Sequence, residues 1–125
     1  RQMKENLGLE NVIFHGVQKN PYPFLKFADL FILSSRYEGF PNVLLEAGAC
    51  GTYSLANNCK GGINEIIQPK INGEISDIEN QKEFAEKILE VLEQTHNKES
   101  IRNSIQSRFS KEIILDKYIE VFEKI

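Results

Sequence analysis

Two glutamates frame the part of the sequence best suited to bind a ligand. Glu38 and Glu46 are the ends of the segment EGFPNVLLE, which follows an apolar run and leads into a helical pattern. In an open α/β sheet, ligands bind where a buried strand ends and a helix begins. The first turn of a helix leaves N–H groups unpaired and carries about half a positive charge, which favours a phosphate or diphosphate there.

The residue types within this segment suit such a site. Gly39 allows a ligand to approach the backbone closely, and Pro41 fixes the backbone at the entry to the helix. Glu46 lies one helical turn after Asn42 and is directed back toward the start of the helix, where its carboxylate can accept hydrogen bonds from a ribose diol. Glu38 offers a second carboxylate from the loop. From spacing alone, two exposed glutamates that only complement the helix dipole are an equally good interpretation.

The elements that position this segment follow from the hydrophobic pattern. Short apolar runs alternate with helical patterns over the first two-thirds of the chain, which predicts a parallel α/β sheet with covering helices. Strands are expected at 11–14, 30–33, 53–56 and 71–75, with 30–33 as a central strand covered on both faces. Helices are expected at 21–26, 43–49 and 64–67, with Gly51 as a left-handed cap after the second.

From about residue 80 only helical patterns remain. They predict helices around 84–92 and 101–109 and a third helix capped by Ser110. The third helix carries an apolar stripe, which we expect to pack on the protein's own sheet because the polar face mixes both signs of charge. The stripe consists of Ile114, Tyr118, Val121, Phe122 and Ile125. One domain is expected, with the sheet and ligand edge in 1–78 and the helices in 79–125.

Composition excludes several classes of protein. The 125 residues carry 15 Lys+Arg against 18 Asp+Glu, a net charge of -3, without the basic stripe that a nucleic-acid partner requires. No apolar run approaches the roughly 20 residues that span a bilayer. Cys50 and Cys59 match no zinc spacing and are expected to be reduced thiols of a cytosolic protein. The charged, helix-like start predicts that the chain begins inside a larger protein, with further strands upstream.

Five segments, in order, resemble the motifs of retaining glycosyltransferases of the GT-B fold, family 4 (glycosyltransferases group 1). Residues 38–46 resemble the E-x7-E motif, 14–16 the F-x-G segment, and 28–35 the A-D-hydrophobic-S-S strand. Residues 46–51 resemble E-A-x-A-C-G, and 61–67 resemble the G-G/P-x-E-I-I segment. The final helix with Tyr118 is similar to the one that closes these proteins. The resemblance covers essentially the whole chain.

The resemblance implies a Rossmann-like, carboxyl-terminal domain of a GT-B enzyme, truncated on its amino-terminal side, that binds the nucleotide-sugar donor. Glu46 would hold the ribose hydroxyls, and Glu38 would contact the donor sugar near the reacting centre. Donor binding is also implied for the backbone of five residues and for a wall beside the base. The five residues are Gly39, Phe40, Asn42, Val43 and Leu44, and the wall is formed by Gly16 and Val17.

For the whole enzyme, the resemblance implies transfer of a hexose or N-acetylhexosamine to a glycan or lipid-linked acceptor in bacterial surface polysaccharide biosynthesis. A UDP-sugar is favoured over a GDP-sugar as donor, and neither metal nor cofactor is expected. The location would be cytoplasmic, with peripheral association at the inner face of the membrane. The basic pair that neutralises the diphosphate and the acceptor-binding domain lie outside these residues, so we expect this chain alone to be inactive.

Alternatives and departures remain open at this stage. A noncatalytic nucleotide-binding or interaction module would keep the same motifs, and so would a phosphorylase or an epimerase of the same fold. Tyr53 replaces the usual proline and Ser54 a valine, which predicts a local change at the entry to that strand. His15 is expected to be structural or solvated, and Asn64 stands where many relatives have Arg.

Overall fold

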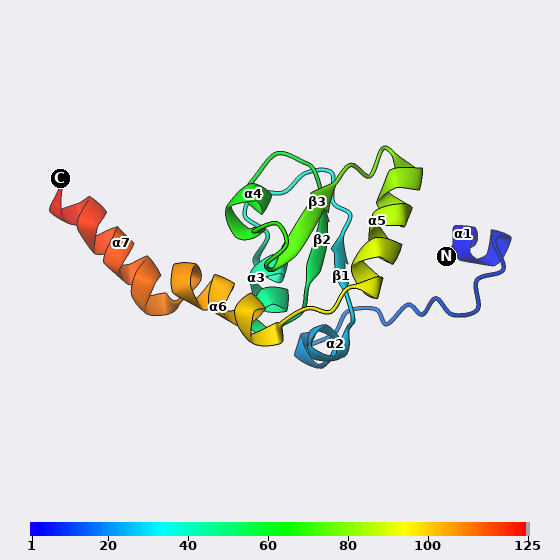
Figure 1. Cartoon of the computed structure of the whole chain (residues 1–125), viewed down its shortest axis with the longest axis horizontal. Coiled ribbons are helices and arrows are strands. Elements are labelled where there is room, and N and C mark those ends of the chain that lie inside the picture. The colour runs from blue at the N-terminus through cyan, green and yellow to red at the C-terminus, as the bar shows by residue number, and fades with distance from the viewer. Residues whose placement is uncertain (125) are drawn as a thin grey trace.

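A short parallel sheet organises the computed structural model, which describes residues 1–124 (Figure 1). The strands β1 (Phe31–Leu33), β2 (Ser54–Asn57) and β3 (Gly73–Ser76) lie in the order β1-β2-β3 and are all parallel. Every residue of β2 is buried, because this strand has a neighbouring strand on each side and helices cover the sheet (Figure 1). The predicted α/β fold with a parallel sheet is confirmed.

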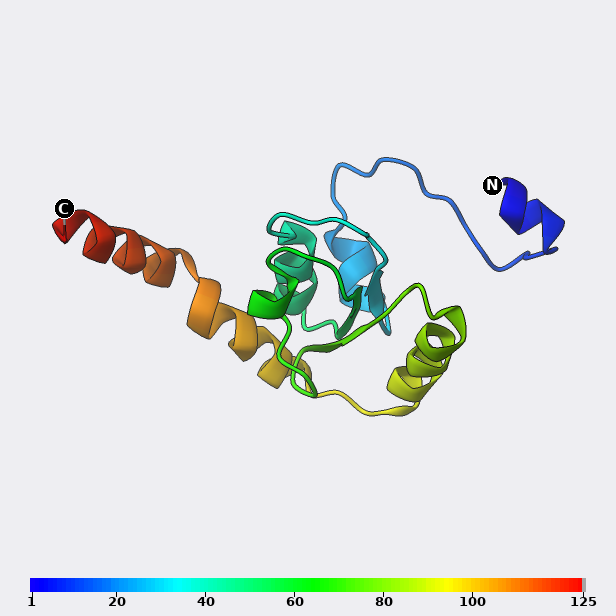
Figure 2. The same ribbon diagram turned by 90° about the horizontal axis from the view of Figure 1, so that it is seen from above.

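Two predictions about the strands are wrong. β1 is an edge strand rather than a central one, and Ile32 within it is 40% exposed. Residues 11–14 form no strand, and Ile13 and Phe14 are exposed on a coil that leads away from the sheet (Figure 2). A strand needs a neighbour to satisfy its N–H and C=O groups, and no strand of the described chain lies beside this coil.

The helices of the first half begin and end close to the predicted residues. They are α1 (Gln2–Asn6), α2 (Tyr22–Phe27), α3 (Asn42–Ala49) and α4 (Ile63–Ile66). Prolines stand at the entries of α2 and α3, where the missing N–H costs no helical hydrogen bond. Gly51, just after α3, has φ +79°, so the predicted left-handed cap is confirmed.

Two apolar cores lie on opposite faces of the sheet. One joins α3, α4 and α6 (Lys98–Phe109) through a cluster of buried residues that includes Leu44, Ile63 and Ile105. The other joins β2's entry to α5 (Gln81–Glu93) and α6 through Tyr53, Val91 and Ile101. Asn80 and Asn97 cap α5 and α6, each accepting a hydrogen bond from an N–H of the first turn.

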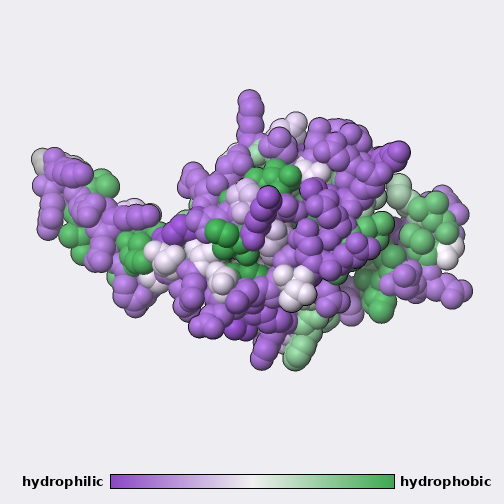
Figure 3. Space-filling model, in the orientation of Figure 1, coloured by the Kyte–Doolittle hydropathy of each residue, from purple (hydrophilic) through white to green (hydrophobic). Residues whose placement is uncertain are grey.

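The last helix, α7 (Lys111–Glu123), projects from the body of the molecule (Figure 1). Ser110 caps it as predicted, with its hydroxyl 3.4 Å from the N–H of Ile113. The expected packing of its apolar stripe on the sheet is wrong, because no residue of α7 is buried and Tyr118 is 59% exposed. Figure 3 shows apolar side chains along this projecting arm. Ile125, the last residue of the predicted stripe, lies outside the described residues.

Candidate functional site

The loop between β1 and α3 rests on a glycine turn. The carbonyl oxygen of Gly39 accepts a hydrogen bond from the N–H of Gly62 at 2.6 Å. A Cβ on Gly61 would overlap the carbonyl oxygen of Glu38, and the φ of Gly61 is +127°, a conformation that side chains disfavour. The pair Gly61-Gly62, just before α4, therefore fixes the backbone of Glu38 and Gly39.

The start of α3 offers hydrogen-bond donors beside this loop. The N–H groups of Asn42 and Val43 have no hydrogen-bond partner within residues 1–124, as expected for a first helical turn. The N–H of Leu44 differs, because it donates to the carbonyl oxygen of Pro41 at 3.0 Å. The side chain of Leu44 is also buried in the core. The N–H of Leu44 is thus already paired in this ligand-free structure, and its role in donor binding stays a prediction.

A cavity of about 440 Å³ lies between α2, β1 and α3. It brings together three of the residues predicted to bind the donor: Gly16, Val43 and Glu46. Glu46 is the only carboxylate among the lining residues, and its carboxylate pairs with no side chain or backbone group in the described part of the chain. The rest of the lining is largely apolar and consists of His15, Gln18, Pro21, Phe24, Leu25, Ala28 and Phe31.

The other predicted site residues lie outside this cavity. Glu38, Gly39 and Phe40 are on the neighbouring loop, with Glu38 half-buried and the other two exposed. Asn42 is exposed at the mouth of α3. Val17 is fully exposed, so it contributes nothing to a wall of the cavity in this structure.

Sequence reasoning missed the aromatic side of the cavity. His15 packs against Phe24 of α2 with ring centroids 4.6 Å apart, although both side chains are exposed. Gly16, directly after it, has φ +69° and turns the chain at this point. The signal for His15 and Gly16 was present in the segment at 14–16, whereas nothing in the pattern of α2 indicated that Phe24 would face the same space.

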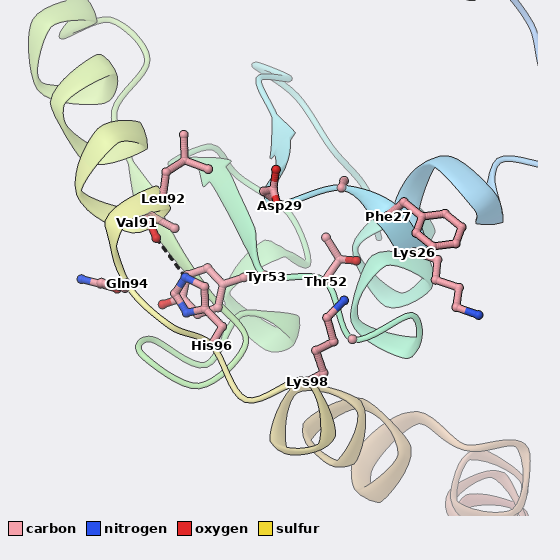
Figure 4. Close-up of a pocket in the computed structure, with 12 residues that line it drawn as sticks. Lys26, Phe27, Asp29, Thr52, Tyr53, Val91, Leu92, Gln94, His96 and Lys98 are labelled. Carbon is pink, nitrogen blue, oxygen red and sulfur yellow. Dashed lines mark hydrogen bonds between the residues drawn. The ribbon is translucent and has the colours of Figure 1, made fainter.

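A second cavity, of about 520 Å³, lies at the amino-terminal ends of β1 and β2 (Figure 4). Figure 4 shows His96 lying against Tyr53, with ring centroids 3.8 Å apart and planes 15° apart. The Nε2 atom of His96 is 3.0 Å from the carbonyl oxygen of Val91, to which it donates. The hydroxyl of Thr52 donates to the carbonyl oxygen of Leu25. These contacts are internal, which is typical of a packed joint between α5, α6 and the sheet.

Burial shapes the electrostatics of this second cavity. Tyr53 is 3% exposed, and its desolvation, with the nearby Glu74 carboxylate as a smaller cause, raises the pKa of its phenol to about 12. The phenol is therefore neutral at physiological pH. Within residues 1–124, no group of three His, Cys, Asp or Glu side chains could hold a metal ion, and no helix is long and apolar enough to cross a membrane.

Comparison with known protein families and curated proteins gives consistent matches. Residues 1–108 match the family model described as glycosyl transferases group 1. The chain is 33% identical over 97% of its length to an N-acetyl-alpha-D-glucosaminyl L-malate synthase of Bacillus anthracis, of which it covers 33%. It is 29% identical over 91% of its length to a Campylobacter jejuni N,N'-diacetylbacillosaminyl-diphospho-undecaprenol alpha-1,3-N-acetylgalactosaminyltransferase, of which it covers 31%.

Solved structures give the same result. The chain superposes on the lipopolysaccharide outer core galactosyltransferase WaaB in its apo form with a TM-score of 0.89 and 26% identity, covering 99% of this chain and 37% of that one. It superposes on Anabaena Alr3699/HepE in complex with UDP with a TM-score of 0.84 and 27% identity, covering 99% and 35%. The chain thus spans about a third of the length of these four proteins.

Proposed function

Because the chain belongs to the family of glycosyl transferases group 1, we propose that it binds the nucleotide-sugar donor of a retaining glycosyltransferase of family 4. Homologues of the chain include glycosyltransferases of bacterial lipopolysaccharide biosynthesis. We also propose that the whole enzyme transfers a hexose or N-acetylhexosamine to a glycan or lipid-linked acceptor, with retention of the configuration at the donor sugar.

The observation that carries the proposal is an unpaired carboxylate beside unpaired N–H groups. Glu46 lies in the wall of the 440 Å³ cavity without a partner in the described chain, and the N–H groups of Asn42 and Val43 are one turn away on the same helix. A ribose diol donates hydrogen bonds and a diphosphate accepts them. One nucleoside diphosphate therefore satisfies both sets of groups at once, with its ribose at Glu46 and its diphosphate at the start of α3.

The loop supplies the sugar-facing part of the proposed site. Glu38 and Gly39 are held by the Gly61-Gly62 turn next to the start of α3, on the side where a sugar attached to the diphosphate would lie. In this position the half-buried carboxylate of Glu38 contacts the donor sugar close to the bond that breaks. The leaving diphosphate gains negative charge in that step and requires fixed positive groups. This chain offers the helix start, while Arg36, the basic residue nearest to Glu38 in sequence, pairs with Glu79 at 3.3 Å.

The relatives support a proposal for the donor nucleotide and for the class of acceptor. UDP is favoured as the nucleotide because a structural relative was crystallised with UDP. One relative uses a diphospho-undecaprenol acceptor by its name and another makes an L-malate glycoside, so acceptor choice varies among proteins that share this domain. A lipid-linked acceptor would place the whole enzyme at the cytoplasmic face of a membrane. We expect transfer itself to require a protein of the relatives' full length, of which this chain spans about a third.

Titration of the 125-residue chain with UDP, GDP and ADP, followed by amide shifts, tests the proposal. We expect UDP to shift amides centred on residues 39–46. Glu46→Gln should weaken UDP binding about tenfold or more, because a hydrogen bond to a charged group contributes about 1.5–3 kcal/mol. Glu112→Gln, on the exposed start of α7, is the matched control and should bind UDP like the parent chain. A folded chain that responds to none of the three nucleotides would contradict the proposed donor site.

A further inference from the structure

The loop between β1 and α3, which contains Glu38, Gly39 and Phe40 and is called the donor loop below, contacts the end of α6 through one aromatic pair. Phe40, in the loop, and Phe109, the last residue of α6, have ring centroids 5.8 Å apart and planes 59° apart. Phe109 is half-buried against the core that joins α3, α4 and α6, whereas Phe40 is 43% exposed. A tilted pair at this distance is an attractive arrangement of two aromatic rings. The buried ring can thus restrain the exposed one.

The opposite side of the loop has little room to move. The ring of Phe40 lies so close to Gly62 that a Cβ there would come within 2.5 Å of Phe40 Cδ2. A Cβ on Gly61 would come closer still to the backbone of Glu38. The loop is therefore in contact with both the glycine turn and the ring of Phe109.

Phe109 itself is held by its neighbour in sequence. The guanidinium of Arg108 lies 4.8 Å from the centre of the Phe109 ring. Arg108 also donates from Nη2 to the carbonyl oxygen of Ile66 at 2.9 Å and from Nη1 to that of Glu65 at 2.5 Å. These are the last carbonyls of α4, the helix that begins just after the glycine turn. Arg108 thus ties the end of α6 to the same element that supports the loop.

We propose that Phe109 is a positioning residue for the donor loop, holding Glu38 and Gly39 in place through its contact with Phe40. The consequence for donor binding rests on the function proposed above, but the effect on the loop does not. Because Phe109 acts on the sugar-facing loop and Glu46 faces the nucleotide, loss of the Phe109 ring should affect binding of the sugar more than binding of the nucleotide.

Three variants of the 125-residue chain test this role. Phe109→Leu removes the ring and keeps most of the apolar volume, Phe109→Tyr restores an aromatic ring, and Phe122→Leu is the control on the exposed face of α7. In the ligand-free chain, Phe109→Leu should shift the amides of 38–40 and 61–62. It should also speed hydrogen exchange of the Gly62 N–H, which donates to Gly39, about three- to tenfold, the range expected for loss of an aromatic pair. Phe109→Tyr and Phe122→Leu should leave these amides as in the parent.

Binding supplies the second readout. Phe109→Leu should weaken binding of UDP-glucose or UDP-N-acetylglucosamine about three- to tenfold, while binding of UDP alone changes less than twofold. Equal loss for UDP and the UDP-sugars, unchanged loop amides in Phe109→Leu, or equal damage from Phe109→Tyr would each overturn the positioning role. If the parent chain binds no nucleotide, the donor site is wrong, and the ligand-free amides still decide whether Phe109 holds the loop. A dispersed spectrum and the thermal midpoint establish that each variant is folded.

Discussion

Two cavities of similar size lie beside the sheet and differ in their chemistry. At the amino-terminal ends of β1 and β2, the 520 Å³ cavity contains His96, which stacks on Tyr53 and bonds to Val91, and also the exposed side chains of Lys26, Asp29 and Lys98. Beside β1 and the start of α3, the smaller 440 Å³ cavity contains the unpaired carboxylate of Glu46. Cavity size therefore does not identify the candidate site. The smaller cavity is distinguished by the unpaired Glu46 carboxylate one turn from the free N–H groups at the start of α3, because one ligand can complete both sets of hydrogen bonds.

The difference follows from the direction of the strands and helices. In a parallel sheet, helices begin near the carboxyl ends of the strands, so free N–H groups and positive dipole ends gather there. The amino ends receive the ends of helices, whose orphan groups are carbonyls. One such carbonyl, that of Val91 at the end of α5, accepts hydrogen bonds from both the Gln94 N–H and His96. The free N–H groups at the start of α3 have no counterpart of this kind within the described residues.

The largest effect is expected from Gly61→Ala, which tests whether the loop depends on the glycine turn. The new Cβ would overlap the carbonyl oxygen of Glu38 and would also occupy a backbone conformation with φ +127°. Strain and overlap together should lower the free energy of unfolding by about 3 kcal/mol or more, or displace the loop. Denaturant unfolding and the amide shifts of 38–40 measure the two outcomes.

Gly8→Ala provides the control for this prediction. Gly8 also has a positive φ, +64°, but a Cβ there would meet nothing within 4 Å. Gly8→Ala should therefore lower the free energy of unfolding by about 1 kcal/mol, because of backbone strain alone, without any change in the loop. If both substitutions lowered the free energy of unfolding equally, the contact between Gly61 and the loop would contribute nothing to stability.

The next largest effect is expected at high pH and comes from the buried phenol of Tyr53. The pKa of Tyr53 is raised from 10.0 to about 12 in the folded chain, so between these values the unfolded chain releases a proton that the folded chain retains. The stabilisation that Tyr53 gives the folded chain is fully present below pH 10 and is lost as pH rises toward 12. The free energy of unfolding should fall by up to about 2.7 kcal/mol over this range, since one pKa unit corresponds to about 1.4 kcal/mol.

Unfolding of the parent and of Tyr53→Phe, measured from pH 9 to pH 12, isolates this contribution. The variant has no phenol to ionise, so its stability should decline less steeply over the same range. Parallel curves for the two proteins would show that Tyr53 is not buried as described.

The smallest effect is expected from His96→Ala, which tests whether the second cavity is only a packed joint. Loss of the stack on Tyr53 and of the hydrogen bond to Val91 should lower the free energy of unfolding by about 1–2 kcal/mol. UDP affinity should not change, whereas Glu46→Gln should change UDP affinity with little effect on stability. A fall in the UDP affinity of His96→Ala would show that the cavity beside His96 takes part in nucleotide binding.

Local features were predictable because their causes lie within a few residues. Pro41 and the apolar spacing after it placed α3, Gly51 marked its end, and Ser110 marked the start of α7. Residues 11–14 and the stripe of α7 were misassigned for a common reason. An apolar pattern predicts that a segment can be buried, but a described partner for either segment is missing, so Phe14 and Tyr118 remain exposed.

Periodicity, turn residues and motifs were enough to predict the α/β class, most of the helices and the segment around Glu38 and Glu46. Packing alone brings Gly16 and His15 to the cavity of Glu46 and Phe109 to Phe40. These are contacts between residues far apart in the chain. Their existence depends on how helices pack across the sheet, which no local pattern encodes.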